Sequence, residues 1–233
     1  MPQSSLRNEL LKSLSQEDFE LLKPSLRHVE LAIKTSLEEA REPIQDVYFP
    51  EWGIASVVAT MSGNRQIEVG IIGRDGMTGM TVVLGDSTPP NETYIQVASA
   101  GSKMPADNLR SAMSKSPTLR SSLLRYANSF LAQASRTALV NGYSKIEERL
   151  ARWLLMVHDR VDGNKLQLTH EFLATMLGAR RPGVTLALNM LEYRGLIHAK
   201  RAEITIVDRA GLMKLTGGAY GPEEARYLGA PSA

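Results

Sequence analysis

The sequence predicts an α+β protein with a β-rich N-terminal part, a long connecting helix and a C-terminal winged helix-turn-helix. Three observations carry this prediction. Short β-branched runs bounded by Gly, Pro, Asn or Asp fill residues 29–104. One apolar face can be followed through residues 117–139. Finally, two helical patterns meet at Gly178 and are followed by a pair of β-branched runs.

Composition excludes several classes of protein. The chain has 233 residues, 43% of them apolar and 22% charged, as in ordinary globular proteins. No apolar run reaches the roughly 20 residues that span a bilayer, and polar residues interrupt the N-terminal segment where a secretory signal would need an apolar core. We therefore expect a cytoplasmic protein without a membrane partner. The absence of cysteine excludes disulfides, thiolate metal sites, cysteine-held iron–sulfur clusters and cysteine nucleophiles.

The N-terminal 115 residues are expected to form a β barrel or sandwich behind one or two short helices within residues 6–26. Five runs at intervals of about ten residues read as strands. They are VYFP, GIASVVATM, IEVGIIG, TVVLG and TYIQVASAG. The stretch SGNRQ is typical of a hairpin turn, and GDSTPPNET of an exposed loop.

A long helix is predicted to begin at Ser116-Pro117, with serine as N-cap and proline in the first turn, and to reach about Leu139. Its apolar stripe predicts pairing with a second copy of the chain, and the alternative is packing onto its own domain. Asn141-Gly142 is expected to break the helix and act as a hinge. The predicted dimer-interface residues are Leu119, Leu123, Ala127, Phe130 and Ala134.

Residues 145–158 form a further amphipathic pattern, and the helix-turn-helix follows it. Thr169 can cap a helix that runs to Leu177, and Gly178 supplies the corner. The next helix, residues 180–193, begins around Arg181-Pro182, where proline is tolerated because a first-turn N–H has no intrahelical partner. A strand pair with a basic tip then forms a wing.

The second helix of such a motif enters the DNA major groove, with its first residues at the base edges. Between Gly178 and Arg201 the chain has five basic residues and one acidic residue, Glu192. This local basic stripe suits a polyanionic partner, and by charge alone a solvated face is an equal alternative. Double-stranded DNA is therefore the predicted partner. The candidate DNA-contacting residues are Thr169, Arg180, Arg181, Thr185, Leu186 and Asn189.

At these residues the chain resembles the Crp/Fnr transcription regulators, relatives of the cyclic-AMP receptor protein. The resemblance rests on VYFPEWG and EVGIIGRDGMTGM, on IEERLARWLL, and most specifically on LTHEFLATMLGARRPGVTLALNMLEYRGLI. It implies a sensor β-roll of the cyclic-nucleotide-binding type (jelly roll) over residues 1–115, a dimerisation helix and hinge over 116–143, and a winged helix-turn-helix over 144–233. It also implies a palindromic operator, with RNA polymerase as a further candidate partner.

The resemblance assigns roles residue by residue. Arg181 falls where the family reads guanine, and Thr169 where a threonine contacts phosphate. Pro182 replaces a base-reading glutamate, and Leu186 replaces a second arginine found in many members. Leu186 can offer only apolar contact, for instance to a thymine methyl group. We therefore expect an operator that differs from that of the cyclic-AMP receptor protein.

The resemblance also bears on the effector. Members that bind cyclic nucleotides pair a Gly-Glu with a later Arg-Ser/Thr, but here Gly79 precedes Met80, and Glu92-Thr93 stands at the second place. A carboxylate at that place would repel a phosphate, so cyclic AMP is not expected to bind. The effector stays unidentified: it is either an uncharged or apolar ligand, or the protein is active without one.

No cofactor or metal site is expected, because the four histidines show no metal-ligand spacing and HEFLA is not HExxH. His28 or a methionine as a haem ligand is an open alternative. An enzyme is not expected either, since no catalytic constellation can be assigned. The alternative to a DNA-binding regulator is a cyclic-nucleotide-binding effector module whose main role is not transcription.

Overall fold

The computed structural model describes residues 2–63 and 65–221. By their internal contacts, the residues group into two compact units. The first consists of residues 1–57 and 70–132, and the second of residues 58–69 and 133–233. A hairpin from the N-terminal half of the chain thus belongs to the same unit as the predicted helix-turn-helix.

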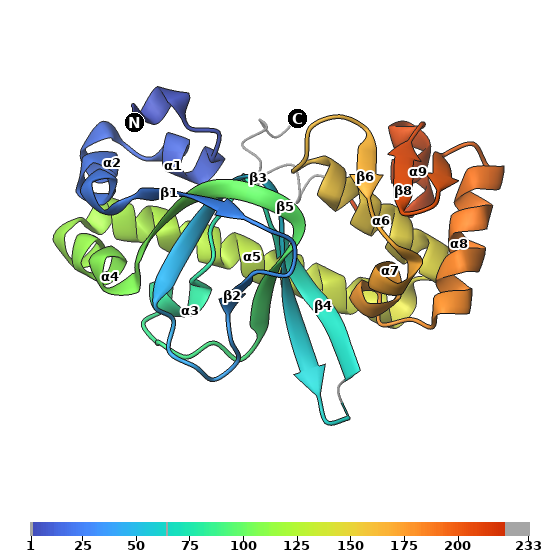
Figure 1. Cartoon of the computed structure of the whole chain (residues 1–233), viewed down its shortest axis with the longest axis horizontal. Helices are drawn as coiled ribbons and strands as arrows, with labels where there is room; N and C mark the ends of the chain where they lie inside the picture. Colours follow the sequence, from blue (N-terminus) through green and yellow to red (C-terminus); the bar gives the residue numbers. More distant parts are fainter. Residues whose placement is uncertain (1, 64, 222–233) are drawn as a thin grey trace. The chain divides into compact units, whose positions relative to one another are not determined.

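The first unit combines short helices with a β-sheet (Figure 1). Two of its strands, β3 and β4, and its longest helix, α5, continue into the second unit. Its elements are η1 (Gln3–Ser5), α1 (Glu9–Ser13), α2 (Gln16–Leu22), η2 (Lys23–Ser25), β1 (Arg27–Leu31), β2 (Ser36–Glu38), β3 (Asp46–Met61), β4 (Arg65–Ile72), α3 (Met80–Val83), β5 (Glu92–Pro105), α4 (Ala106–Lys115) and α5 (Pro117–Tyr143).

The sheet has the strand order β1-β5-β3-β4, and β2 also pairs with β5. Strands β1 and β5 are antiparallel, with Arg27 opposite Lys103. The predicted runs VYFP and GIASVVATM are one 16-residue strand, β3, rather than two. Gly53 allows this continuity, because its φ is +76° and a Cβ there would lie 2.4 Å from the carbonyl oxygen of Ala98.

The run TVVLG was predicted as a strand and is instead the one-turn helix α3. Gly79 precedes this helix with a φ of +83° and redirects the chain. Val82 and Val83 are buried in the core of the unit. Burial of these side chains outweighs their β propensity, which is weak compared with tertiary packing.

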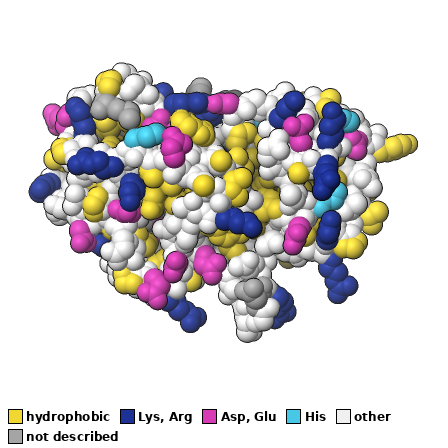
Figure 2. All heavy atoms as spheres, in the orientation of Figure 1, with side chains coloured by type: hydrophobic (Ala, Val, Ile, Leu, Met, Phe, Trp, Pro, Cys, Tyr) yellow, Lys and Arg dark blue, Asp and Glu magenta, His cyan; other side chains and the backbone are white. Residues whose placement is uncertain are grey.

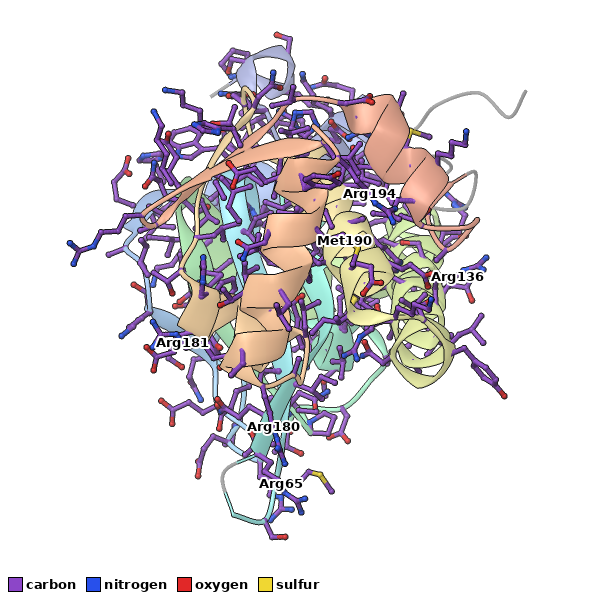
Figure 3. All side chains as sticks on the ribbon, turned by 90° about the vertical axis from the view of Figure 1, so that its right-hand side faces the viewer. Arg65, Arg136, Arg180, Arg181, Met190 and Arg194 are labelled. Atoms are coloured by element: carbon purple, nitrogen blue, oxygen red, sulfur yellow. The ribbon has the colours of Figure 1, made fainter. Side chains whose placement is uncertain are left out.

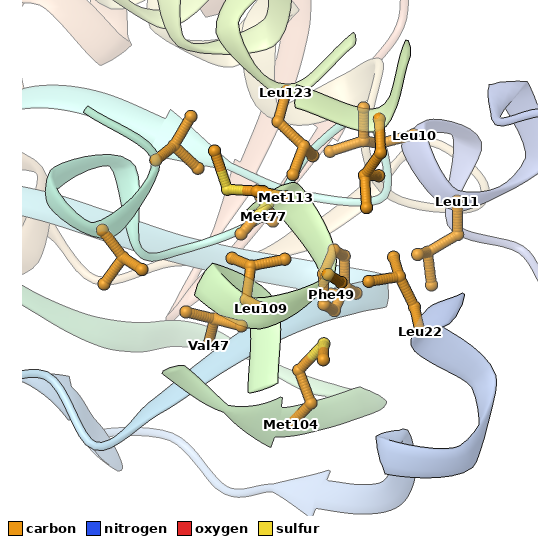
Figure 4. Packing of buried hydrophobic residues seen from close by; sticks show 14 of the residues in the cluster. Leu10, Leu11, Leu22, Val47, Phe49, Met77, Met104, Leu109, Met113 and Leu123 are labelled. Carbon is orange, nitrogen blue, oxygen red and sulfur yellow. The ribbon is translucent and has the colours of Figure 1, made fainter. Parts of the chain in front are cut away.

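The core of the first unit lies between the helices and the sheet (Figure 4). Leu119, Leu123 and Ala127 of α5 belong to this core, with 0%, 0% and 6% of their surface exposed. The prediction that these three residues form a dimer interface is therefore wrong, and the alternative of packing onto their own domain holds for them. Each buried leucine gains about 1.5–3 kcal/mol by leaving water here, so it is not available to a second copy.

Helix α5 does not end at the predicted hinge. It starts at Pro117 as expected and continues through Asn141 and Gly142 to Tyr143. The amide of Ser144 still donates to the carbonyl of Val140 at 2.9 Å. A glycine costs a helix only about 1 kcal/mol relative to alanine, and the surrounding turns offset that cost.

Beyond the end of α5, the described residues of the second unit form four helices and a three-stranded sheet. Its further elements are α6 (Ile146–His158), β6 (Lys165–Gln167), α7 (His170–Met176), α8 (Arg181–Tyr193), β7 (Ile197–Lys200), β8 (Glu203–Ile206) and α9 (Arg209–Leu215). The small sheet has the order β6-β8-β7. Among the residues that the structure describes, no helix combines the length and hydropathy needed to cross a membrane.

Candidate DNA-binding interface

Helices α7 and α8 meet at a glycine corner, as the sequence predicts. The hydroxyl oxygen of Thr169 accepts a hydrogen bond from the amide of Phe172 at 3.2 Å and so caps α7. Because the oxygen accepts there, the hydroxyl proton of exposed Thr169 remains able to donate to another group. Gly178 turns the chain with a φ of +55°, and α8 begins at Arg181 with Pro182 in its first turn.

Helix α6 contacts this corner and stabilises it. The guanidinium group of Arg149 donates to the carbonyl of Leu177, the last residue before the corner. Partial burial lowers the pKa of Arg149. Trp153 of α6 packs edge-on against Phe172 of α7, with ring centroids 5.6 Å apart and an interplanar angle of 63°. The corner is thus fixed by a polar contact and an aromatic contact from one helix.

One face of α8 is buried, and the opposite face is open. Its buried residues are Val184, Ala187, Leu188 and Leu191. The open face contains Arg181, Leu186 and Asn189, as predicted, and Leu186 is 69% exposed. It also contains Met190 and Tyr193, which the sequence analysis did not single out. Helical spacing could have identified them, because Met190 and Tyr193 lie one and two turns after Leu186 and therefore on the same side of the helix.

Thr185 differs from the other candidate DNA-contacting residues because its hydroxyl is already engaged. The hydroxyl donates to the carbonyl of Arg181 at 3.1 Å. Its oxygen also lies 3.1 Å from Nδ1 of His170, which must then be the donor of that bond. Half-buried Thr185 therefore braces α8 against α7.

Two basic residues lie at the N-terminal end of α8. Arg180 and Arg181 are both exposed, and Figure 3 shows their side chains leaving the helix start in different directions. Arg194 lies at the other end of α8, where it is the C-cap. Figure 2 shows further Lys and Arg side chains over the part of the second unit that contains the helix-turn-helix and the small sheet.

The predicted wing is present as β7 and β8, joined by Arg201 and Ala202. Exposed Lys200 lies at its tip, paired in register with Glu203. Glu192, the one acidic residue in the basic stretch, accepts a hydrogen bond from the amide of Ala199 at 2.9 Å and contacts His198 at 2.9 Å. The acidic side chain thus ties α8 to the wing.

In the first unit, the carboxylate of Glu38 accepts hydrogen bonds at the two places where the sequence departs from the nucleotide-binding pattern. Oε1 of Glu38 accepts from the amide of Gly79 at 2.6 Å, and Oε2 accepts from the hydroxyl of Thr93. Burial raises the pKa of Glu38, and the two hydrogen bonds oppose that rise. Nearby, Lys103 forms an ion pair with Asp46 at 2.7 Å.

The alternative haem ligand His28 is exposed and contacts Glu30 at 3.1 Å. Within residues 2–63 and 65–221, no group of three or more His, Cys, Asp or Glu side chains could hold a metal ion.

Comparison with known proteins agrees with this geometry. Residues 148–215 match the family described as the Crp-like helix-turn-helix domain. No curated protein sequence matches the chain.

Several solved structures share the fold. A CRP-family transcriptional regulator from Thermus thermophilus aligns with a TM-score of 0.67 and 18% identity over 81% of this chain and 96% of its own. FixK2 from Bradyrhizobium japonicum aligns with a TM-score of 0.67 and 16% identity over 82% and 96%. The c-di-GMP-responsive global regulator CLP of Xanthomonas campestris aligns with a TM-score of 0.66 and 17% identity over 82% and 99%.

Proposed function

We propose that this chain, which carries a Crp-like helix-turn-helix domain within the fold of the Crp/Fnr regulators, is a homodimeric transcription regulator. It reads a palindromic operator through α8 and does not answer to cyclic AMP. The observation that carries the proposal is that helix α8 has one buried face and one exposed face. Its inner face is buried, and its outer face presents two arginines at the N-terminal end, where such a helix meets base edges.

The exposed side chains of α8 suit direct readout in the major groove. The guanidinium group of Arg181 can donate two parallel hydrogen bonds to O6 and N7 of guanine. The amide of Asn189 suits adenine, and Leu186 suits a thymine methyl group. Arg180 and the hydroxyl of Thr169 are assigned to phosphates, which fix the position of the helix without reading sequence. Thr185 acts indirectly by bracing the helix.

Dimerisation is proposed to use the outer face of α5. Leu124 and Leu131 are 38% and 63% exposed and lie seven residues apart, so they recur on one side of the helix. Phe130 and Ala134 are half-buried and can border this face. A dimer with two-fold symmetry would present its two recognition helices to half-sites about 34–36 Å apart, one turn of DNA.

The exclusion of cyclic AMP is supported by Glu38. Its carboxylate already accepts hydrogen bonds from the amide of Gly79 and the hydroxyl of Thr93. A cyclic phosphate that used these two donors would therefore have to displace an internal carboxylate. Glu92, beside Thr93, adds a second negative charge. The effector is therefore an uncharged or apolar ligand, or the protein is active without one, and RNA polymerase is the partner proposed for the DNA-bound dimer.

Selection of binding sites from random DNA by the full chain tests the proposal. We expect an inverted repeat whose half-site centres are one helical turn apart, and no change in affinity when cyclic AMP is added. A single unrepeated site would contradict the dimer, and no enriched site would contradict sequence-specific binding. Cyclic-AMP binding without DNA binding would favour the effector-module alternative.

A further inference from the structure

The hairpin formed by the outer ends of β3 and β4, residues 58–69, touches the corner of the helix-turn-helix. A Cβ atom placed on Gly178 would lie 2.7 Å from Cδ1 of Ile67. This separation means that the isoleucine side chain packs directly onto the glycine between α7 and α8. The glycine therefore serves both the turn and the approach of the hairpin.

A buried hydrogen bond anchors the same hairpin to α6. Nε1 of Trp153 donates to Oε1 of Glu68 at 2.6 Å, and Glu68 is 4% exposed. Trp153 also packs on Phe172 at the start of α7. The hairpin is thus held at the corner by Ile67 and at α6 by Glu68, next to the element that is proposed to enter DNA.

This anchoring places Arg65 beside the start of α8. Arg65 precedes Ile67 by two residues on β4, about 7 Å along a strand, and lies on the same face of the strand. Arg180 follows Gly178 by two residues, at most about 7 Å of chain. In Figure 3, Arg65 and Arg180 are both labelled toward the end of α8 at which the helix begins. Both residues are exposed, and neither guanidinium group has a hydrogen bond or an ion pair with another residue that the structure describes.

We propose that the tip of this hairpin is a second DNA-contacting element, in which Arg65 binds a backbone phosphate at the edge of the groove that α8 enters. The inference rests on the proposed function. An α-helix with its side chains is about 10–12 Å wide and fills a major groove about 12 Å wide. A cation beside the N-terminal end of the inserted helix therefore meets the phosphate backbone that borders the groove.

Charge at the hairpin favours the same partner. Its two charged residues are Arg65 and Glu68, and Glu68 is buried against Trp153. The surface that the hairpin presents is therefore cationic. Exposed Ser62 and half-buried Gln66 add polar groups that can donate to phosphate oxygens.

Affinity for the selected operator, measured against salt concentration with full-length protein, tests the contact. Arg65→Ala should weaken binding to all sequences alike and lower the slope of log K against log salt by about 0.9 per half-site. The ratio of wild-type to variant affinity should therefore fall about threefold per half-site between 50 and 200 mM salt. Arg65→Lys should retain the slope, and Arg41→Ala, which removes an exposed arginine of the first unit, should match the wild type.

The binding measurements distinguish a failure of the hairpin contact from a failure of the proposed function. If the wild type binds its operator and Arg181→Ala alters base preference, but Arg65→Ala behaves as the wild type, the hairpin contact is wrong and the function stands. Tighter binding by Arg65→Ala would show that the hairpin hinders DNA and would also overturn the inference. If the wild type enriches no DNA sequence, the proposed function itself fails.

A direct readout uses the absence of cysteine from the chain. Arg65→Cys, Arg180→Cys and Arg41→Cys each provide one thiol, to which an iron chelate that cleaves nearby DNA sugars can be attached. We expect cleavage from positions 65 and 180 at neighbouring nucleotides on the border of each half-site, and none from position 41. Cleavage from position 180 without any from position 65 would overturn the inference.

Discussion

Trp153 and Glu68 are joined by a buried hydrogen bond of 2.6 Å, although 85 residues separate them in the chain. Trp153 lies in α6 and Glu68 in β4, so this bond attaches a hairpin of the N-terminal half to the helix behind the helix-turn-helix. The same indole ring packs against Phe172. Trp153 therefore stabilises both the hairpin position and the first helix of the motif.

Replacing Trp153 with phenylalanine removes the N–H donor and keeps an aromatic ring. Because loss of the donor leaves a buried acceptor oxygen without this bond, which costs about 1–3 kcal/mol, the free energy of unfolding should fall by about that much. Urea unfolding followed by circular dichroism measures the change. Trp52→Phe, at the other, partly exposed tryptophan, is the matched control. Equal stability of the two variants would mean that the bond contributes little.

Arg181→Ala should reduce affinity by roughly 1–3 kcal/mol per half-site and relax the preference at one base pair, because two hydrogen bonds to guanine are lost. Arg180→Ala should instead weaken all sequences alike and lower the salt slope by about one unit per half-site. Titration of a panel of point-mutated operators distinguishes the two. If the phenotypes were exchanged, Arg180 would be the base reader.

Leu186 is predicted to contact a thymine methyl group. Leu186→Ala should lower operator affinity by about 0.8 kcal/mol per methylene buried at the contact, with little effect on stability since the side chain is 69% exposed. Uracil in place of the contacted thymine should lower wild-type affinity and leave that of the variant unchanged. Leu84→Ala, at another exposed leucine, is the control. If Leu186→Ala and the replacement of thymine by uracil lowered affinity additively, the proposed contact between Leu186 and the thymine methyl group would be refuted.

Leu124→Glu combined with Leu131→Glu should convert a dimer into a monomer, because both side chains lie on the exposed face of α5. Sedimentation at micromolar concentration measures the mass. Leu84→Glu changes another exposed leucine of the first unit and should leave the dimer intact. Leu123→Glu should unfold the first unit instead, since it buries a charge in the core. A wild type that sediments as a monomer would contradict the proposed interface.

The raised pKa of Glu38 predicts a pH dependence of stability. Between the ordinary carboxyl value of 4.5 and the higher folded value, the folded state binds more protons than the unfolded state. The contribution of Glu38 therefore favours folding at low pH and declines as pH rises through that window. Glu38→Gln, which does not titrate, should lack this decline when unfolding is followed from pH 4 to pH 7. Identical pH profiles for both proteins would contradict the assignment.

Local signals in the sequence were sufficient for much of the DNA-binding part. The Thr169 cap, the Gly178 corner and the Pro182 helix start each depend on residues within a few positions, and the structure has all three. The open face of α8 also follows from helical spacing. Thr185 is the exception there, because its hydroxyl is taken by His170, which lies 15 residues away.

Tertiary structure alone decided the features that depend on distant partners. The apolar stripe of α5 was visible in the sequence, but periodicity does not reveal whether such a stripe faces its own core or a second copy, and Leu119 and Leu123 face the core. The run TVVLG became helical because its valines are buried there. Likewise, only the fold brought Ile67 to Gly178 and the carboxylate of Glu38 to Gly79 and Thr93. Local residue types determine caps, turns and faces, whereas the choice of what covers a face depends on residues far apart in the chain.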